Sequence, residues 1–210
     1  MRNAILLISL AAASLAAQTV PAASPALMLF TDAANGASFR YPAPWTLAKD
    51  PPFSIPLSTS ASADGSSKNP LRAIVFTKSL PGLPSWPKTP FAGVEIGYDA
   101  PPAPSADACR TLANLGNEQN AKIGKLNLQG ISYWHTKRAS AGLGHGMEED
   151  IYTTFLAAPP GVCLRFDLAV HTVHVDGDVP LRALTPRELA LIHASLLGVL
   201  NSVRIPAPPR

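Results

Sequence analysis

The sequence predicts an α+β fold in which a central antiparallel β-sheet is flanked by helices. The chain has 22 prolines, and none of them falls between Pro104 and Pro159. Because proline is excluded from helix interiors and central strands, the central elements should begin in that window. Several runs alternate apolar and polar residues with period two, as strands do. Two helical patterns are present, and they do not alternate regularly with the strands, which excludes a repeated βαβ arrangement.

Residues 1–18 have the pattern of a secretory signal peptide: an early Arg2, an apolar run from Ala4 to Leu15 and small residues after it. The alternative is an uncleaved anchor, but the run is shorter than the ~20 residues of a typical membrane span. We therefore expect export to the periplasm or beyond, with no membrane span after cleavage. Residues 19–25 are expected to be a flexible lead-in, residues 26–205 a single domain and residues 206–210 a tail.

The first half of the chain predicts four strands, the first two joined as a hairpin through the turn residues Asn35 and Gly36. These strands are expected over residues 27–30, 38–41, 71–78 and 92–98. Residues 49–70 are rich in serine and proline and predict a loop. Four prolines between Pro81 and Pro90 predict an extended, stiffened segment.

The second half begins with a helix that Ser105 should cap and that should end near Leu115. Strands are expected over residues 122–128, 131–138, 151–157 and 162–171, with a glycine-rich loop between the second and third. Thr185 and Glu188 predict a capping box that opens the last helix. Its apolar stripe consists of Leu189, Ile192, Leu196 and Val199, widened by Leu191, Ala194 and Gly198. A final short strand is expected over residues 202–205.

The two cysteines, Cys109 and Cys163, predict one disulfide, because an even count in an exported chain favours pairing. Cys109 lies early in the predicted helix and Cys163 early in a strand, on the face opposite its apolar stripe. The bond would hold the helix across the second face of the sheet. Two free buried thiols are the alternative.

Composition and motifs exclude several function classes. The formal net charge of +3 is small, and no cluster of lysine and arginine with interleaved aromatics indicates a nucleic-acid partner. No nucleophile elbow, zinc-protease helix or phosphate loop is present. We therefore predict no catalytic, cofactor-binding or metal-binding residue and no cofactor. Arg165 and Asp167, on the same strand face as Cys163, are expected to form part of a cross-strand salt-bridge lattice, and a catalytic pair is the alternative.

The histidines support an alternative function, a small exported metal-dependent hydrolase. His171 and His174 precede two aspartates, Asp176 and Asp178, and further histidines are available at positions 135 and 145. On a continuous strand, however, positions 171 and 174 point to opposite faces. Convergence of three of these side chains in space would favour the hydrolase. Scattered histidines would favour a binding protein.

Two loops are candidate contact surfaces for an unidentified envelope or extracellular protein. The stiffened segment presents Leu83 and Trp86, and tryptophan is enriched among binding hot spots. The glycine-rich loop, expected over residues 139–147, presents Leu143, His145 and Met147. The alternative for Trp86 is that it folds back and caps an edge of the sheet.

Both ends of the predicted domain carry a resemblance. The segment N-G-A-S-F-R-Y-P-A-P-W, residues 35–45, resembles the opening of PsbP-like domains, and A-S-L-L-G-V-L-N-S-V-R-I, residues 194–205, resembles their end. The resemblance implies a central antiparallel sheet flanked by helices, a fold shared with a Ran-binding nuclear import factor and many exported bacterial domains. It also implies a non-catalytic role through protein–protein contact. No catalytic residue is carried over.

Overall fold

The computed structural model describes residues 25–48, 72–85, 87–111, 123–141, 147–157, 161–173 and 182–206. The strands in these ranges are β1 (Leu27–Thr31), β2 (Ser38–Pro42), β3 (Thr46–Ala48), β4 (Ala73–Thr77), β5 (Phe91–Asp99), β6 (Pro102–Ala103), β7 (Gly124–Leu128), β8 (Ile131–Ala141), β9 (Met147–Ala157) and β10 (Gly161–Val173). The helices are α1 (Ala106–Thr111) and α2 (Pro186–Asn201).

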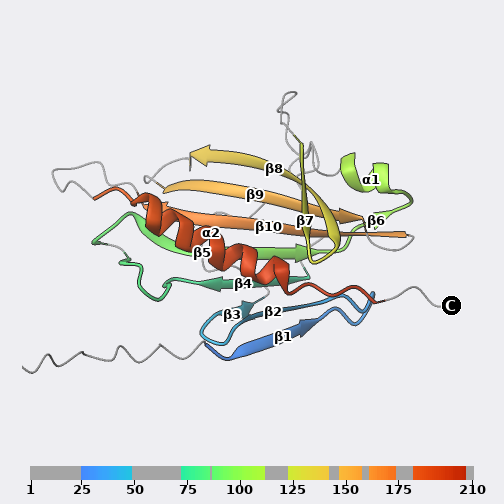
Figure 1. Cartoon of the computed structure of the whole chain (residues 1–210), viewed down its shortest axis with the longest axis horizontal. Coiled ribbons are helices and arrows are strands. Elements are labelled where there is room, and N and C mark those ends of the chain that lie inside the picture. Colours follow the sequence, from blue (N-terminus) through green and yellow to red (C-terminus); the bar gives the residue numbers. More distant parts are fainter. Residues whose placement is uncertain are drawn as a thin grey trace, which may run out of the picture.

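Most of the strands form one antiparallel sheet in the order β3-β4-β5-β10-β9-β8-β7, and β6 pairs with the start of β10. The central pair, β5 and β10, is in register with Phe166 opposite Tyr98 and Leu168 opposite Ile96. Hairpin β1–β2 is a separate two-stranded sheet. Figure 1 shows the long strands side by side, with α2 running across them.

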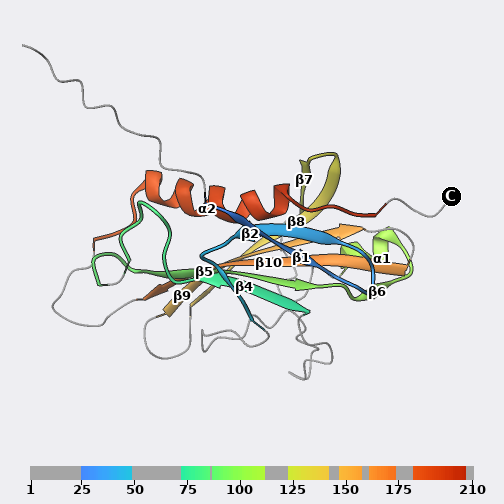
Figure 2. The same ribbon diagram turned by 90° about the horizontal axis from the view of Figure 1, so that it is seen from below.

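The two faces of the sheet differ in chemistry. One face, called here the apolar face, carries Val94, Ile96 and Tyr98 from β5 together with the even-numbered residues Leu164 to Val170 of β10. Helix α2 and hairpin β1–β2 cover this face, as the two views agree (Figures 1 and 2). The alternation predicted for β5 and β10 is confirmed, but the opposite face of both strands is also buried.

The hairpin attaches to the apolar face through aromatic rings. The ring of Phe39 lies 4.9 Å from that of Phe30 and 5.7 Å from those of Tyr98 and Phe166. Rings at these separations are attracted by more than their buried area alone. Gly36 in the connecting turn has φ of 73°, which a residue with a side chain rarely adopts and which explains the glycine there. The predicted hairpin is thus confirmed.

Helix α2 begins as its sequence predicts. Thr185 is its N-cap, and its hydroxyl accepts a hydrogen bond from the Glu188 amide. In return the Thr185 amide donates to the Glu188 carboxylate, which completes the capping box. Ile192, Leu196, Val199 and Leu200 are the buried residues of α2. Two predicted members of the stripe, Leu189 and Leu191, are 38% and 36% exposed instead. They lie on the flanks of the helix, beyond the part that faces the sheet.

The opposite face, called here the polar face, carries the disulfide. Cys109 of α1 is bonded to Cys163 of β10 with their Cα atoms 5.3 Å apart, so the predicted crosslink is confirmed and the two free thiols are not present. Both cysteines are buried together with Ala103, and the half-buried Trp134 packs against them. The short helix is therefore held at the end of the sheet where β6 and β10 meet.

Several predicted boundaries need correction. Strand β8 continues to Ala141 and β9 already begins at Met147, so the loop expected over residues 139–147 is shorter. The final strand reduces to one bridge between Arg204 and Ser38. Strands β3 and β6 were not predicted. Among the described residues, α2 alone runs along a face of the sheet, and α1 has six residues, so the expected flanking by helices applies to one face.

Candidate functional site

An apolar groove with a volume of about 560 Å³ opens beside α2. One wall is the flank of the helix, the other is the outer face of hairpin β1–β2, and the segment after β4 closes one end. Its lining residues are Pro25, Leu27, Arg40, Pro42, Pro44, Trp45, Ser79, Leu80, Pro81, Leu191, Ala194, Ser195, Gly198, Val199 and Ser202. Most of these side chains are aliphatic, aromatic or proline, so the groove suits an apolar guest.

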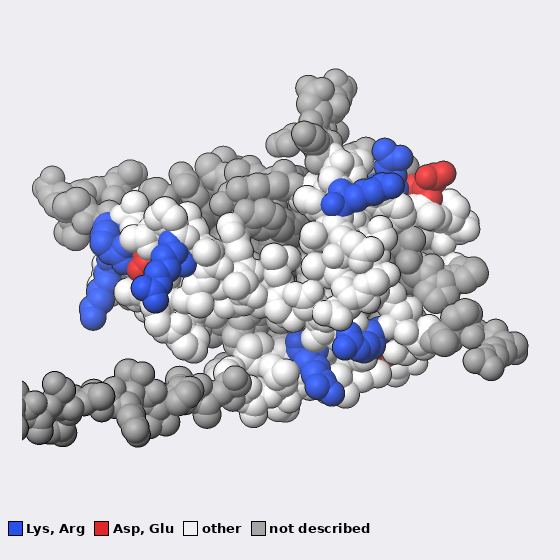
Figure 3. All heavy atoms as spheres, in the orientation of Figure 1, with Lys and Arg blue, Asp and Glu red and all other residues white. Residues whose placement is uncertain are grey.

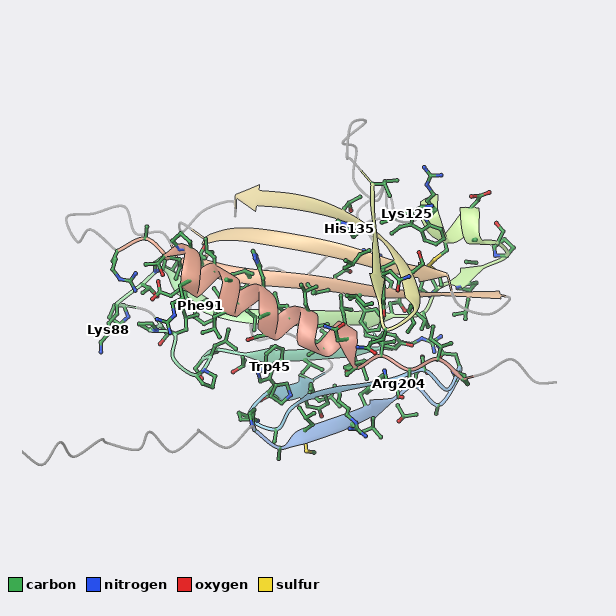
Figure 4. All side chains as sticks on the ribbon, viewed as in Figure 1. Trp45, Lys88, Phe91, Lys125, His135 and Arg204 are labelled. Carbon is green, nitrogen blue, oxygen red and sulfur yellow. A yellow bond between two sulfur atoms is a disulfide. The ribbon has the colours of Figure 1, made fainter. Side chains whose placement is uncertain are left out.

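Small residues on α2 make the groove deep enough to accept a side chain. Ala194 and Gly198 are one helical turn apart and both line it. A Cβ atom added at Gly198 would have no heavy atom within 4 Å. The buried Trp45, which is 5% exposed, forms part of the floor and lies below α2 in the view of Figure 4.

Charge is scarce around the groove. Among its lining residues only Arg40 is charged. Figure 3 shows the face of the molecule that carries α2 as largely uncharged, with the coloured side chains near its margins. Leu191 and Leu27, at the two walls, are 36% and 57% exposed. Exposed apolar surfaces of this kind often mark the site at which a protein contacts another molecule.

A hydrogen-bond network fixes the hairpin against the sheet. The Asp32 carboxylate, 6% exposed, accepts hydrogen bonds from Arg72 Nη1 at 2.8 and 3.0 Å, from the Tyr98 hydroxyl at 2.9 Å and from Asn35 Nδ2 at 2.7 Å. Burial alone would raise the pKa of Asp32. The Ala34 amide, the Tyr98 hydroxyl and the Arg72 guanidinium outweigh burial and hold this pKa below its usual value. The turn end of the hairpin is therefore tied to β5 by a charged group.

The same hairpin is tied to the end of α2. The Ser202 hydroxyl accepts a hydrogen bond from the Arg40 amide at 2.7 Å and donates one to the Arg40 carbonyl at 3.0 Å. Backbone hydrogen bonds of 3.0 and 2.8 Å join Ser38 to Arg204 in both directions. Both walls of the groove are thus held by hydrogen bonds, so its shape is set before any guest arrives.

The polar face buries a second cluster of charged side chains. His171 Nε2 lies 3.2 Å from Glu95 Oε2, and Arg165 Nε lies 3.1 Å from Asp167 Oδ2. All four residues are at most 2% exposed. Arg165 and Asp167 form an ion pair within β10, whereas the expectation was a lattice of pairs across strands. Glu95 Oε1 has no hydrogen-bond partner among the described residues.

Another carboxyl group of this face, Asp99, lies opposite Arg165 in the pairing of β5 and β10. Burial raises the pKa of Asp99, although the Ala100 amide and the charges of Arg165 and Arg72 act against this. Charges held this far from water require partners, and the His171–Glu95 and Arg165–Asp167 pairs supply them. The cluster therefore has the character of an internal ion-pair network of the sheet.

The histidines that can be placed do not converge. The register puts His171 on the polar face and His135 on the apolar face, where its imidazole lies over Gly124 of β7. Within the described ranges, no three or more histidine, cysteine, aspartate or glutamate side chains are grouped so that they could hold a metal ion. His145, His174, Asp176 and Asp178 lie outside the described residues.

The residues predicted for partner contact have separate outcomes. Leu83 is 7% exposed and belongs to the apolar core, so the expectation that its loop presents it is wrong. The chain turns there, with the Leu83 amide donating to the Leu80 carbonyl at 3.1 Å, and this turn directs the side chain inward. Trp86, Leu143 and His145 lie outside the described residues, and Met147 is described only as the first residue of β9.

No sequence motif indicated the groove. The available clue was an apolar residue, Leu191, on the margin of the stripe of α2, beside the small residues Ala194 and Gly198. This pattern was interpreted as a wider buried stripe. Within the described ranges, no helix combines the length and the apolar character that crossing a membrane requires.

The comparison with solved structures finds several matching chains. No family model and no curated protein matches the chain. The solution structure of cyanobacterial PsbP (CyanoP) from Synechocystis sp. PCC 6803 aligns with 89% of this chain and 96% of its own, at 11% identity and a TM-score of 0.44. The two end segments, residues 35–45 and 194–205, resemble the same family in sequence, and no functional residue is taken from the structural likeness.

Proposed function

We propose that this chain is an exported, non-catalytic binding domain that acts through protein–protein contact. The observation that carries the proposal is the apolar groove between α2 and hairpin β1–β2, which is held in shape by hydrogen bonds on both walls. Preformed apolar concavities with few polar groups are the usual form of a binding site. The signal-peptide pattern of residues 1–18 and the Cys109–Cys163 disulfide support export.

The residues that line the groove indicate which kind of ligand it would bind. A segment of an envelope or extracellular protein with adjacent apolar side chains would fill the space over Ala194 and Gly198. A carboxylate on the same segment would meet Arg40, the single charge of the lining. Such a pair at the rim contributes more to orientation and association rate than to affinity. The affinity would come from apolar side chains that replace water in the groove.

A matched pair of leucines on α2 provides the test. Leu191 lines the groove and is 36% exposed, whereas Leu197 has the same exposure within one percentage point, 37%, and does not line it. A photoreactive amino acid at Ser195, inside the groove, should crosslink to one partner in the native exported fraction. Leu191→Lys should remove that adduct, and Leu197→Lys should leave it.

Filling the groove gives an independent check. Gly198→Phe places a ring into open space, so the domain should fold normally and lose the crosslink. Thermal unfolding of each variant separates a lost surface from a lost fold. Equal adduct yields from the wild type, Leu191→Lys and Gly198→Phe would show that the groove is not the contact surface.

A second contact surface is proposed on the stiffened segment, because a shallow cavity of about 470 Å³ lies within it. It is lined by Gly82, Leu83, Pro84, Ser85, Pro87 and Lys88. Trp86 and, on the glycine-rich loop, Leu143, His145 and Met147 remain proposed contact residues. A Trp86→Ala variant that keeps its melting temperature and loses the partner would support this surface, and one that loses stability would contradict it.

A further inference from the structure

Strand β1 has one free edge. It pairs with β2 on one side, from Leu27 opposite Pro42 to Thr31 opposite Ser38, and no other strand of the described ranges pairs with it. Figures 1 and 2 agree in placing β1 on the outside of the molecule. An edge of this kind presents backbone donors and acceptors that can template another strand.

The hydrogen-bond pattern shows which residues present those groups. The Ala43 amide donates to the Ala26 carbonyl at 2.7 Å, and the Asp32 amide donates to the Ala37 carbonyl at 2.8 Å. Because bonded and non-bonded pairs alternate in an antiparallel ladder, residues 28 and 30 also bond to β2. The amide and carbonyl groups of Leu27, Leu29 and Thr31 therefore point away from the hairpin.

Nothing in β1 blocks this edge. The strand reads L-M-L-F-T, with no charged residue, no proline and a regular register. Leu27, Met28 and Leu29 are 57%, 49% and 61% exposed, which makes them the most exposed large apolar residues described. Natural edge strands are normally protected by charges, prolines or bulges, so an unprotected apolar edge indicates a pairing partner.

We propose that this edge binds a second copy of the chain, β1 against β1 in antiparallel orientation about a twofold axis at Leu29. The three outward residues, Leu27, Leu29 and Thr31, are symmetric about Leu29. The axis pairs Leu29 with its own copy and Leu27 with Thr31 of the other copy. Each of these pairs can exchange two backbone hydrogen bonds, so the free groups on both edges are satisfied together.

Side chains and charges agree with this register. On the inner side of the new four-stranded sheet, Met28 would lie opposite Phe30 of the second copy, a favourable thioether–aromatic contact. Arg40 is the charged residue closest to the axis in the ladder, opposite Leu29 on β2. The two copies of Arg40 would be three strand spacings apart, about 14 Å, and screening over ~8 Å at physiological salt removes most of their repulsion.

The assembly closes at two copies, because pairing uses the free edge of both hairpins. The contact is a single strand with its neighbours, below the ~800 Å² per partner of a stable complex, so we expect a dissociation constant on the order of 0.1 mM. The proposal goes beyond the proposed function, since the groove lies over the outer face of the hairpin and the dimer uses its edge.

Sedimentation equilibrium and residue-level amide exchange on the chain purified from its host test the proposal. The average mass should rise toward two copies as the concentration increases. Over the same range the amides of Leu27, Leu29 and Thr31 should become protected, while those of Met28 and Phe30, already bonded to β2, should change little. Protection without this alternation, or a mass that stays at one chain up to about 1 mM, would overturn the proposal.

Variants distinguish pairing at the β1 edge from nonspecific association of the chain. Leu29→Pro removes an outward amide and leaves the ladder to β2 intact, as proline on an edge strand does, so the dissociation constant should rise about tenfold or more. Leu29→Lys is a second variant, in case proline perturbs the hairpin, and should act in the same direction. Leu47→Lys, at a leucine 44% exposed on β3, is the matched control and should not change it. Equal dissociation constants for all four chains would refute the edge pairing, as would binding of a different protein at β1.

Discussion

Two buried tyrosines on the apolar face allow a measurement of how much the hydrogen-bond network of Asp32 contributes to the free energy of unfolding. Tyr98 is 1% exposed and Tyr133 is not exposed at all, and both rings belong to the same core. The hydroxyl of Tyr98 donates to Asp32 at 2.9 Å. The hydroxyl of Tyr133 has no hydrogen-bond partner among the described residues. Replacement of each by phenylalanine removes the same atom from two different environments.

The two substitutions should change the free energy of unfolding in different directions. Tyr98→Phe removes a hydrogen bond to a carboxylate and leaves Asp32 with one donor fewer, which costs about 1.5–3 kcal/mol. Tyr133→Phe removes a buried hydroxyl whose desolvation is not compensated, so the variant should be unchanged or more stable by up to about 1 kcal/mol. Neither change removes ring volume, so the cavity term of larger truncations does not enter.

Alkaline pH probes both hydroxyls, because burial raises the pKa of Tyr98 as well as that of Tyr133. Burial raises the pKa of Tyr133 to about 12, from the usual tyrosine value of 10.0. Between these values the unfolded chain loses its proton and the folded chain keeps it, so the stability from this group is complete below pH 10 and is lost as the pH rises through 12. Tyr133→Phe should therefore lose less stability on this alkaline side than the wild type.

Urea unfolding of the wild type and both variants at neutral pH, and again at alkaline pH, measures these quantities. The slopes against urea should be the same for all three chains, because the core keeps its size. A loss of more than 1 kcal/mol in Tyr133→Phe, or no loss in Tyr98→Phe, would show that the hydroxyl environments are not those described here.

Three further changes have defined expectations in the same urea assay. Asp32→Asn removes the carboxylate that Arg72 and Tyr98 contact and should cost about 2 kcal/mol at neutral pH. Because the pKa of Asp32 is lowered, this difference should shrink as the pH falls below its usual value of 3.8, and a difference that persists would contradict it. Gly198→Ala, in the interior of α2 with open space around it, should stabilise by about 0.5–1 kcal/mol, and a loss would mean that the site is crowded. Replacing Cys109 and Cys163 by alanine opens a loop of 54 residues and should cost about 4 kcal/mol, whereas an unchanged midpoint would argue against the crosslink.

Local patterns predicted most of the sheet and the start of α2. The alternation of β10, the turn at Gly36 and the capping box at Thr185 each depend on residues close in sequence, and the structure shows all three. The disulfide was predictable because the chain has two cysteines and one pairing. The residues of these elements specify them without information from distant parts of the chain.

Elements that depend on distant partners were missed. Strand β3 has three residues and β6 has two, and each is defined by pairing, to β4 and to β10 respectively. Strands this short carry no periodicity that a sequence could show. Leu83 was misjudged for a related reason, because prolines predict an extended segment but not the side of the turn on which the core lies.

The groove was not predictable from any one stretch. Its walls come from residues 25–45, 79–81 and 191–202, which only the folded sheet brings together. The buried pair of Glu95 and His171 is a similar case, since the two residues are 76 positions apart and meet because β5 and β10 are neighbours. The sequence predicts a strand at each of these residues but does not show that the two strands are neighbours.

Hairpin β1–β2 contributes to both proposed contacts, with a different surface for each. Its outer face forms a wall of the groove, and its free edge is the proposed dimer contact, with Leu27 the residue common to both. The Asp32 network holds the turn end against β5, and Ser202 holds the middle of β2 against α2. A ligand in the groove would therefore bind a hairpin whose position is already fixed. A second copy of the chain would pair with backbone groups of β1 that this ligand does not use. Occupation of one site should change affinity at the other only through Leu27, so the coupling free energy should be small.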